Sequence, residues 1–195
     1  MISSVKPYPL ITDAIRRGAS DELIGLFERF PEMWDLKVPA FGTWLHFASA
    51  HGTLPIVQYL VQHGFDPDQR NEDGCNPAAL ASAKGKADIL DCLLSSGSQI
   101  DLSDSVRNPL FGAILAGSSA SVERLLEAGI DTTPSYQFGS VPERLDAVAF
   151  AVLHGQSALA RLIASTHSRD PRVVDDMLEA ALAKAHLVTT AAPLT

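Results

Sequence analysis

The chain has 195 residues, of which 46% are hydrophobic, and this favours one folded domain with a sizeable core over a disordered tail. Its 15 Lys and Arg residues against 23 Asp and Glu residues give a net charge of −8, which argues against nucleic acid and anionic membrane as partners and favours a basic partner. No apolar run reaches the roughly 18 residues of a membrane span, and the first residues lack a signal-peptide core, so we expect a cytoplasmic protein.

Paired glycines recur along the chain, each pair with the same separation. The pairs are Gly52 with Gly64, Gly85 with Gly97, and Gly117 with Gly129. A helix that ends abruptly favours glycine just past its end, because glycine adopts the left-handed conformation without a clash. Each pair therefore predicts the ends of two consecutive short helices.

Apolar residues between the paired glycines repeat at helical spacing. The three regular stripes are Val57, Leu60, Val61; Leu90, Leu93, Leu94; and Val122, Leu125, Leu126. Two looser stripes flank them: Leu23, Leu26, Phe27 and Leu159, Leu162, Ile163. Five units result, and each is too small to bury its apolar face alone, so the sequence predicts a repeat array.

The opening of the second unit carries the clearest motif. Thr43–Ala48 reads TWLHFA, which resembles the TPLHxA opening of the ankyrin repeat. A second opening starts 33 residues later at Asn76, and a third starts 32 residues after that at Asn108. Pro77 and Pro109 follow these residues and suit the first turn of a helix. The resemblance covers roughly residues 8–167 and implies an all-α ankyrin-repeat solenoid of helix-turn-helix units with short hairpin-like fingers.

The resemblance divides residues 1–187 into a single domain. Repeats are expected near residues 8–42, 43–75, 76–107, 108–145 and 146–167. Asp170 and Pro171 open a further helix over 170–187, which we interpret as a C-terminal cap, with docking of a partner as the alternative; residues 188–195 are expected to be a frayed tail. The interval from Asn108 to Asp146 is longer than its neighbours, which predicts an enlarged finger around residues 136–140.

Histidines and carboxylates near the motif suggest a metal site, with His46, His51, His63, Asp66 and Asp68 as ligands. The repeat pattern places these residues on separate helices and turns. We therefore favour a structural role for His46 and solvent exposure for the other two histidines, and expect no metal-binding residues.

Two cysteines are candidates for a nucleophile. Cys92 falls on an apolar stripe and is expected in the core, whereas Cys75 is expected to be more accessible but has no histidine placed to activate it. Carboxylate pairs such as Glu72 and Asp73 are adjacent in sequence and are not arranged across a cleft. We expect no catalytic or cofactor-binding residues and no enzymatic activity.

The family resemblance implies contacts with a partner protein at the finger tips and at the last turn of each first helix, along a concave face. These positions are Phe41, Trp44, His51, Glu72, Asp73, Lys84, Asp104, Arg107, Leu115, Tyr136, Phe138, Glu143, Arg144 and His154. Arg16 and Arg17 end the first helix at the same position of the repeat. We expect the four aromatic residues to be exposed, although local packing is an equal alternative for Phe41 and Trp44.

Acidic residues dominate the middle fingers, where Asp66, Asp68, Glu72, Asp73, Asp101 and Asp104 outnumber Arg70 and Arg107. A small acidic protein of this kind resembles the immunity proteins that bacteria keep beside toxins. The resulting hypothesis is a protein, monomeric when unbound, that binds and inhibits a basic partner such as a toxin or effector enzyme, and binds neither nucleic acid nor membrane. The alternatives are a non-inhibitory adaptor and, more remotely, an enzyme or small-ligand binder.

Overall fold

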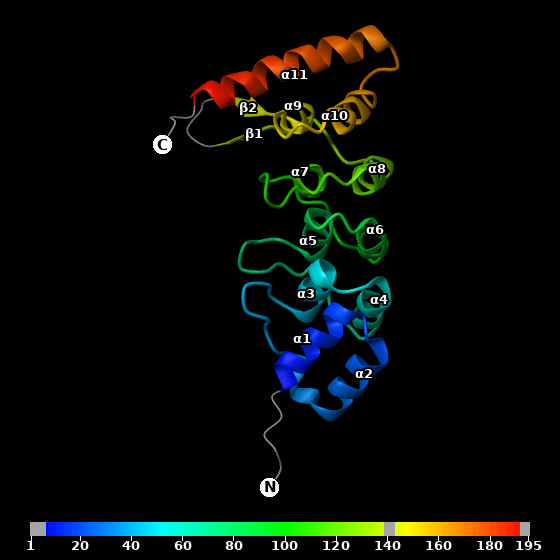
Figure 1. Cartoon of the computed structure of the whole chain (residues 1–195). Coiled ribbons are helices and arrows are strands. Elements are labelled where there is room, and N and C mark those ends of the chain that lie inside the picture. The colour runs from blue at the N-terminus through cyan, green and yellow to red at the C-terminus, as the bar shows by residue number, and fades with distance from the viewer. Residues whose placement is uncertain (1–6, 139–142, 192–195) are drawn as a thin grey trace. The chain divides into compact units, whose positions relative to one another are not determined.

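A computed structural model describes residues 7–138 and 143–191 of the chain (Figure 1). Over these residues the helices are α1 (Pro7–Arg17), α2 (Ser20–Arg29), α3 (Trp44–His51), α4 (Leu54–Gln62), α5 (Pro77–Ala83), α6 (Ala87–Ser95), α7 (Pro109–Leu115), α8 (Ser119–Glu127), α9 (Ala147–Leu153), α10 (Ser157–Ala164) and α11 (Pro171–Ala191). A single 3-10 turn, η1 (Pro31–Met33), follows α2. The expected all-α fold is confirmed, because the helices follow one another in short pairs.

Two compact units share these elements. The first comprises residues 1–81 and 88–99, and the second comprises residues 82–87 and 100–195. The boundary therefore runs through the pair α5 and α6.

Side-chain caps start the first helix of several helix pairs. The Asn108 side chain accepts a hydrogen bond from the backbone N–H of Leu110, and Asp146 accepts one from Ala149 at the start of α9. Helices α5 and α7 begin at Pro77 and Pro109, as the sequence predicts. These caps satisfy backbone donors that have no partner within the helix, and they fix where each repeat begins.

The paired glycines do not all have the same role. Gly64 ends α4 with a φ of +93°, the left-handed conformation expected of it. Gly52 has a φ of −86°, so the expectation of a left-handed cap is wrong there. A Cβ at Gly52 would lie 2.8 Å from the Ala48 carbonyl oxygen of α3 and 3.2 Å from Ile15 Cγ2 of α1, so glycine avoids a clash with the backbone of α3 and crowding against α1.

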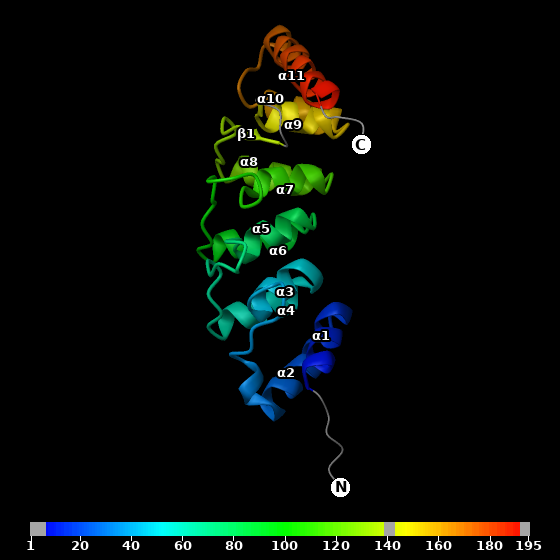
Figure 2. The same ribbon diagram turned by 90° about the vertical axis from the view of Figure 1, so that its left-hand side faces the viewer.

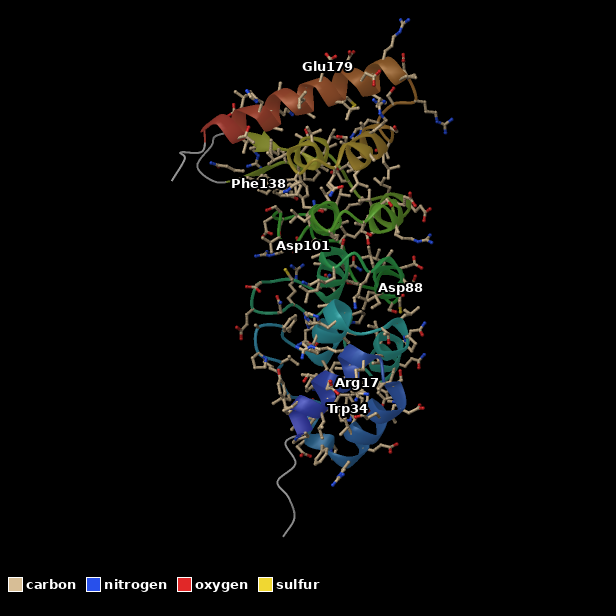
Figure 3. The ribbon with its side chains drawn as sticks, in the orientation of Figure 1. Arg17, Trp34, Asp88, Asp101, Phe138 and Glu179 are labelled. Atoms are coloured by element: carbon tan, nitrogen blue, oxygen red, sulfur yellow. The ribbon has the colours of Figure 1, made fainter. Side chains whose placement is uncertain are left out.

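The core of the first unit is aliphatic along the helices and aromatic at its first repeat. Ile15, Leu23, Leu60 and Leu90 are fully buried. Trp34, labelled in Figure 3, follows η1, and its ring stacks on Phe27 at a centroid distance of 4.3 Å. In α4 and α6 the first two residues of the apolar stripe are buried and the third is half-buried, whereas in α2 Leu26 is half-buried and Phe27 is buried.

An antiparallel hairpin enlarges the loop that precedes α9 in the second unit. Strand β1 (Tyr136–Gln137) pairs with β2 (Arg144–Leu145), with Tyr136 opposite Leu145. The enlarged finger expected around residues 136–140 corresponds to this hairpin at residues 136–138. Residues 139 and 140 lie outside the described residues.

Helix α11 packs on α9 and α10 of the second unit (Figures 1 and 2). Its contact face includes the buried side chains of Val174, Ala181 and Ala185. The helix ends at Ala191, so the expected fraying from residue 188 is wrong for residues 188–191. The sequence has no glycine or proline to stop the helix after Leu187 until Pro193. Residues 192–195 lie outside the described residues.

None of the helices in the described part of the chain is both long and apolar enough to cross a membrane.

Candidate functional site

A groove of about 650 Å³ separates two loops of the first unit. Its walls are residues 37–43, which precede α3, and residues 69–73 of the loop that precedes α5. The lining includes the predicted partner-binding residues Phe41, Glu72 and Asp73. Both loops are held by local hydrogen bonds, so the groove has a defined shape.

A tight turn shapes the first loop. The N–H of Val38 donates to the carbonyl of Gly42 at 2.7 Å, and the N–H of Phe41 donates to the carbonyl of Val38 at 3.0 Å. Ala40 within the turn has a φ of +64°, a left-handed conformation that costs a residue with a Cβ about 1 kcal/mol or more. The turn places the half-buried ring of Phe41 between the groove and α3.

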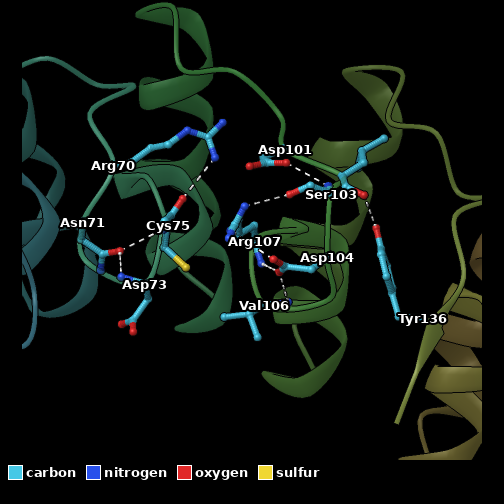
Figure 4. Close-up of polar contacts among 12 residues, drawn as sticks. Arg70, Asn71, Asp73, Cys75, Asp101, Ser103, Asp104, Val106, Arg107 and Tyr136 are labelled. Atoms are coloured by element: carbon cyan, nitrogen blue, oxygen red, sulfur yellow. Dashed lines mark hydrogen bonds and ion pairs between the residues drawn. The ribbon is translucent and has the colours of Figure 1, made fainter.

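The second loop is closed by Asn71 (Figure 4). Its Oδ1 accepts hydrogen bonds from the backbone N–H groups of Asp73 and Cys75, at 3.1 and 2.9 Å. The Arg70 guanidinium donates to the carbonyl of Gly74. This closed turn leaves the side chains of Glu72 and Asp73 exposed to solvent.

The first aromatic cluster, composed of Phe41, Phe47 and His51, adjoins the groove. Phe41 lies 5.1 Å from each of the other two rings, and Phe47 lies 4.9 Å from His51. Phe47 is buried below, whereas Phe41 and His51 are half-buried. The cluster extends the groove wall onto the last turn of α3.

The second aromatic cluster, composed of Phe138, Phe150 and His154, has the same residue types in the second unit, with Phe150 between the other two rings. Phe138 stacks on Phe150 at 4.7 Å, and Phe150 lies 4.4 Å from His154. The sequence reasoning selected the outer residues of both clusters but missed the buried Phe47 and Phe150. A signal was present, because each buried Phe follows its helix-opening residue, Thr43 or Asp146, by the same interval and is followed one turn later by histidine.

Two predicted contact residues are buried, so their assignment to a partner-binding surface is wrong. Trp44 is 0% exposed, and its Nε1–H donates to the carbonyl of Met33 while its ring packs near Tyr8 and Phe27. Tyr136 is 8% exposed, donates to the carbonyl of Leu102 and accepts from Asn108. Both rings fill space between consecutive repeats, and their polar atoms are satisfied inside the protein.

Most of the predicted acidic edge serves to fold the loops. Asp68 Oδ1 accepts from Asn76 Nδ2 and from the N–H of Gln99, and Asp66 accepts from the N–H of Asp68. Asp101 and Asp104 accept from backbone N–H groups in the same way. These four carboxylates are therefore oriented by the loops themselves, whereas Glu72 and Asp73 are exposed to solvent.

The other predicted contact residues lie in the second unit. Arg107 is half-buried and lies 3.1 Å from Asp104 Oδ2, Arg144 bonds Ser135, and Glu143 is half-buried. Lys84 is exposed, and Leu115 exposes 58% of its surface. Val106, at 68% exposure, was not predicted. Their role in binding stays a prediction.

The suggested metal and nucleophile groups lie in separate environments. His46 is buried and bonds Thr43 and the carbonyl of Cys75, whereas the exposed His63 packs on Tyr59. Within residues 7–138 and 143–191, no three metal-ligating side chains gather at one point. The expected order of cysteine exposure is wrong: Cys75 is 4% exposed because its backbone is tied to Asn71 and His46, and Cys92 is half-buried.

The amino-acid sequence is similar to that of known protein families and individual proteins. Residues 45–136 match the family of ankyrin repeats in three copies. Protein PhlB of Serratia liquefaciens is 37% identical over 122 residues, which are 62% of this chain and 52% of PhlB. Protein phosphatase 1 regulatory subunit 27 of Mus musculus is 36% identical over 93 residues, which are 47% of this chain and 60% of that protein.

A further relative is a much longer protein than this chain. The inactive serine/threonine-protein kinase TEX14 of Mus musculus is 36% identical over 80 residues, 40% of this chain but 6% of the kinase. The chain thus spans about half the length of PhlB and a small part of TEX14. Ankyrin repeats are protein-interaction modules, and residues 45–136 of this chain carry three of them.

Proposed function

We propose that this protein binds a partner protein through the groove of the first unit and inhibits it. The observation that carries the proposal is the groove between residues 37–43 and 69–73, which continues at Phe41 into the first aromatic cluster. A concave surface with a partly exposed aromatic wall and charged rim has the composition of a protein-binding site. A partner segment in this groove would be covered by both loops.

Inhibition is supported by charge and by one relative. The net charge is −8, and the exposed Glu72 and Asp73 are placed to meet a basic surface. A similar protein is named as a regulatory subunit of protein phosphatase 1. In its most specific form the proposal is an immunity protein that covers the basic active site of a cognate toxin in the cytoplasm.

The test uses the partner captured from native cells with the intact chain. We expect the partner's catalytic activity to fall to zero as the chain reaches a stoichiometric amount. Changing both Glu72→Lys and Asp73→Lys should weaken binding by about tenfold at low salt and flatten its salt dependence, because the attraction would be replaced by repulsion.

A matched control is available in the same unit. Glu28→Lys with Asp91→Lys makes the same change in net charge at exposed positions on α2 and α6, away from the groove. Equal weakening by both pairs would show a net-charge effect and contradict a contact at the loops. A partner that is bound but remains fully active would contradict inhibition.

An adaptor is the second candidate function, because each unit carries an aromatic cluster with a half-buried Phe. Two such clusters would permit two partners to be held by one chain. Capture of two different proteins, neither of them inhibited, would favour this alternative.

A further inference from the structure

Arg16 is a positively charged residue held at the edge of the first aromatic cluster. It lies in the last turn of α1, and its Cζ is 5.2 Å from the centroid of the Phe47 ring. This cation–π contact orients the guanidinium without consuming its hydrogen-bond donors. The arrangement places a cation against Phe47, whose ring also contacts Phe41 and His51.

The neighbouring Arg17 differs from Arg16 in its charged partners, although both lie in the last turn of α1. Arg17 is one residue further along and is neutralised by Asp13 at 2.7 Å and Glu22 at 2.8 Å. Arg16 is exposed, and no carboxylate of the described residues forms an ion pair with it. A guanidinium is well suited to bind a carboxylate through two parallel hydrogen bonds.

Phe41 connects this cation to the groove. Its ring contacts Phe47 and His51 on one side and lines the groove on the other. A chain segment leaving the groove would therefore place an apolar side chain against Phe41 before it reaches Arg16. The acidic residues of the groove, Glu72 and Asp73, lie in the loop before α5, whereas Arg16 lies on α1.

We propose that the first aromatic cluster and Arg16 bind a partner segment in which an apolar side chain is close to an acidic one. The apolar side chain packs on Phe41, and the carboxylate pairs with Arg16. This inference rests on the proposed function and specifies the segment of the partner that the site recognises. It is independent of the basic surface assigned to Glu72 and Asp73.

Selection from a random peptide library displayed on phage tests the inference with the full chain as bait. We expect enriched peptides to carry Asp or Glu near an aromatic or aliphatic residue. Arg16→Gln should abolish the enrichment of acidic residues, and Arg16→Glu should favour Lys or Arg in their place. For the best peptide we expect Arg16→Gln to weaken binding by about fivefold.

The control is Arg29→Gln, which removes an exposed arginine held over Phe30 at 5.3 Å at the end of α2. It should leave both the selection and the affinity unchanged. Thermal unfolding of each variant checks that the fold is intact.

Three results would overturn the inference: no peptide enriched, no excess of acidic residues, or equal effects of the Arg16 and Arg29 variants. If any of these occurs while the chain still inhibits its captured partner, the proposed function stands and only the inference falls. If inhibition also fails, both are wrong.

Discussion

His46 is fully buried at the start of α3, and each of its ring nitrogens has a hydrogen-bond partner. Nδ1 faces the backbone N–H of Thr43, which only donates, so Nδ1 is an acceptor and the ring proton is on Nε2. Nε2 lies 3.2 Å from the carbonyl of Cys75 and ties the second loop of the groove to α3. Protonation of Nδ1 would turn its contact with the Thr43 N–H into a repulsion.

The pH dependence of stability follows from this geometry. Burial lowers the pKa of His46 below its ordinary value of 6.5, although the carbonyls of Cys75 and Gln69 partly oppose the shift. The unfolded chain therefore binds a proton more readily than the folded protein. The contribution of His46 is fully present above its ordinary pKa and is lost as the pH falls through that value toward the lower pKa of the folded state.

We expect the urea concentration at the midpoint of unfolding to decrease as the pH is lowered from about 7.5 to about 5.5, the range in which histidine titrates. His46→Gln should lower the free energy of unfolding at the higher pH by about 1–3 kcal/mol, since a buried group loses its partner, and should reduce the pH dependence. His63→Gln changes an exposed histidine and should preserve the dependence. A dependence unchanged in the His46 variant would refute this assignment.

At the scale of the element, α9 shows how local and distant contacts combine. The Asp146 carboxylate caps the helix by accepting from the N–H of Ala149 at 2.9 Å, and its other oxygen pairs with Lys184 of α11 at 3.1 Å. One side chain thus sets the start of α9 and contacts the helix that covers it. The cap is short-range in sequence, whereas the ion pair joins residues 146 and 184.

Removing the cap should cost more stability than removing the ion pair. We expect Asp146→Ala to lower the free energy of unfolding by about 1 kcal/mol, the usual cost of a lost N-cap. Lys184→Met should cost about 0.5 kcal/mol or less, because the pair is partly exposed to solvent. Asp146→Asn keeps the capping oxygen and should resemble Lys184→Met. The measurement is urea unfolding followed by circular dichroism; a larger loss for Lys184→Met than for Asp146→Ala would contradict this ranking.

At the scale of the whole molecule, the two aromatic clusters provide a test of how many partners the chain binds. Each cluster has its own half-buried Phe, Phe41 in the first unit and Phe138 in the second. In a repeat protein each repeat contacts only its neighbours, so a surface change in one unit has a local effect.

Phe41→Ala and Phe138→Ala therefore separate the two candidate functions. An inhibitor that acts through the first unit should lose about 2 kcal/mol of binding free energy with Phe41→Ala and little with Phe138→Ala. An adaptor should lose one captured protein with each variant. Affinity capture followed by mass spectrometry and titration calorimetry measures both outcomes, and a full loss of inhibition caused by Phe138→Ala alone would exclude the first unit as the inhibitory surface.

The helical repeats are encoded by signals between residues close in the sequence, so they could be predicted from the sequence alone. The spacing of Thr43, Asn76 and Asn108, the prolines that follow two of them and the apolar stripes are short-range signals, so the all-α ankyrin fold was predicted and is confirmed. The same register identified Phe41, His51, Glu72 and Asp73 as surface candidates, because position within a repeat largely sets exposure.

The tertiary structure alone decided which candidate side chains are available to a partner. Trp44 is directed into the core below η1, Tyr136 fills space beside Leu102, and Cys75 is enclosed by Asn71 and His46. Each outcome depends on side chains from a neighbouring repeat or loop that meet the residue only after folding. The spacing of a repeat sets the direction of its helices, but the volumes and hydrogen-bonding groups of adjacent repeats determine whether a given ring is buried or exposed.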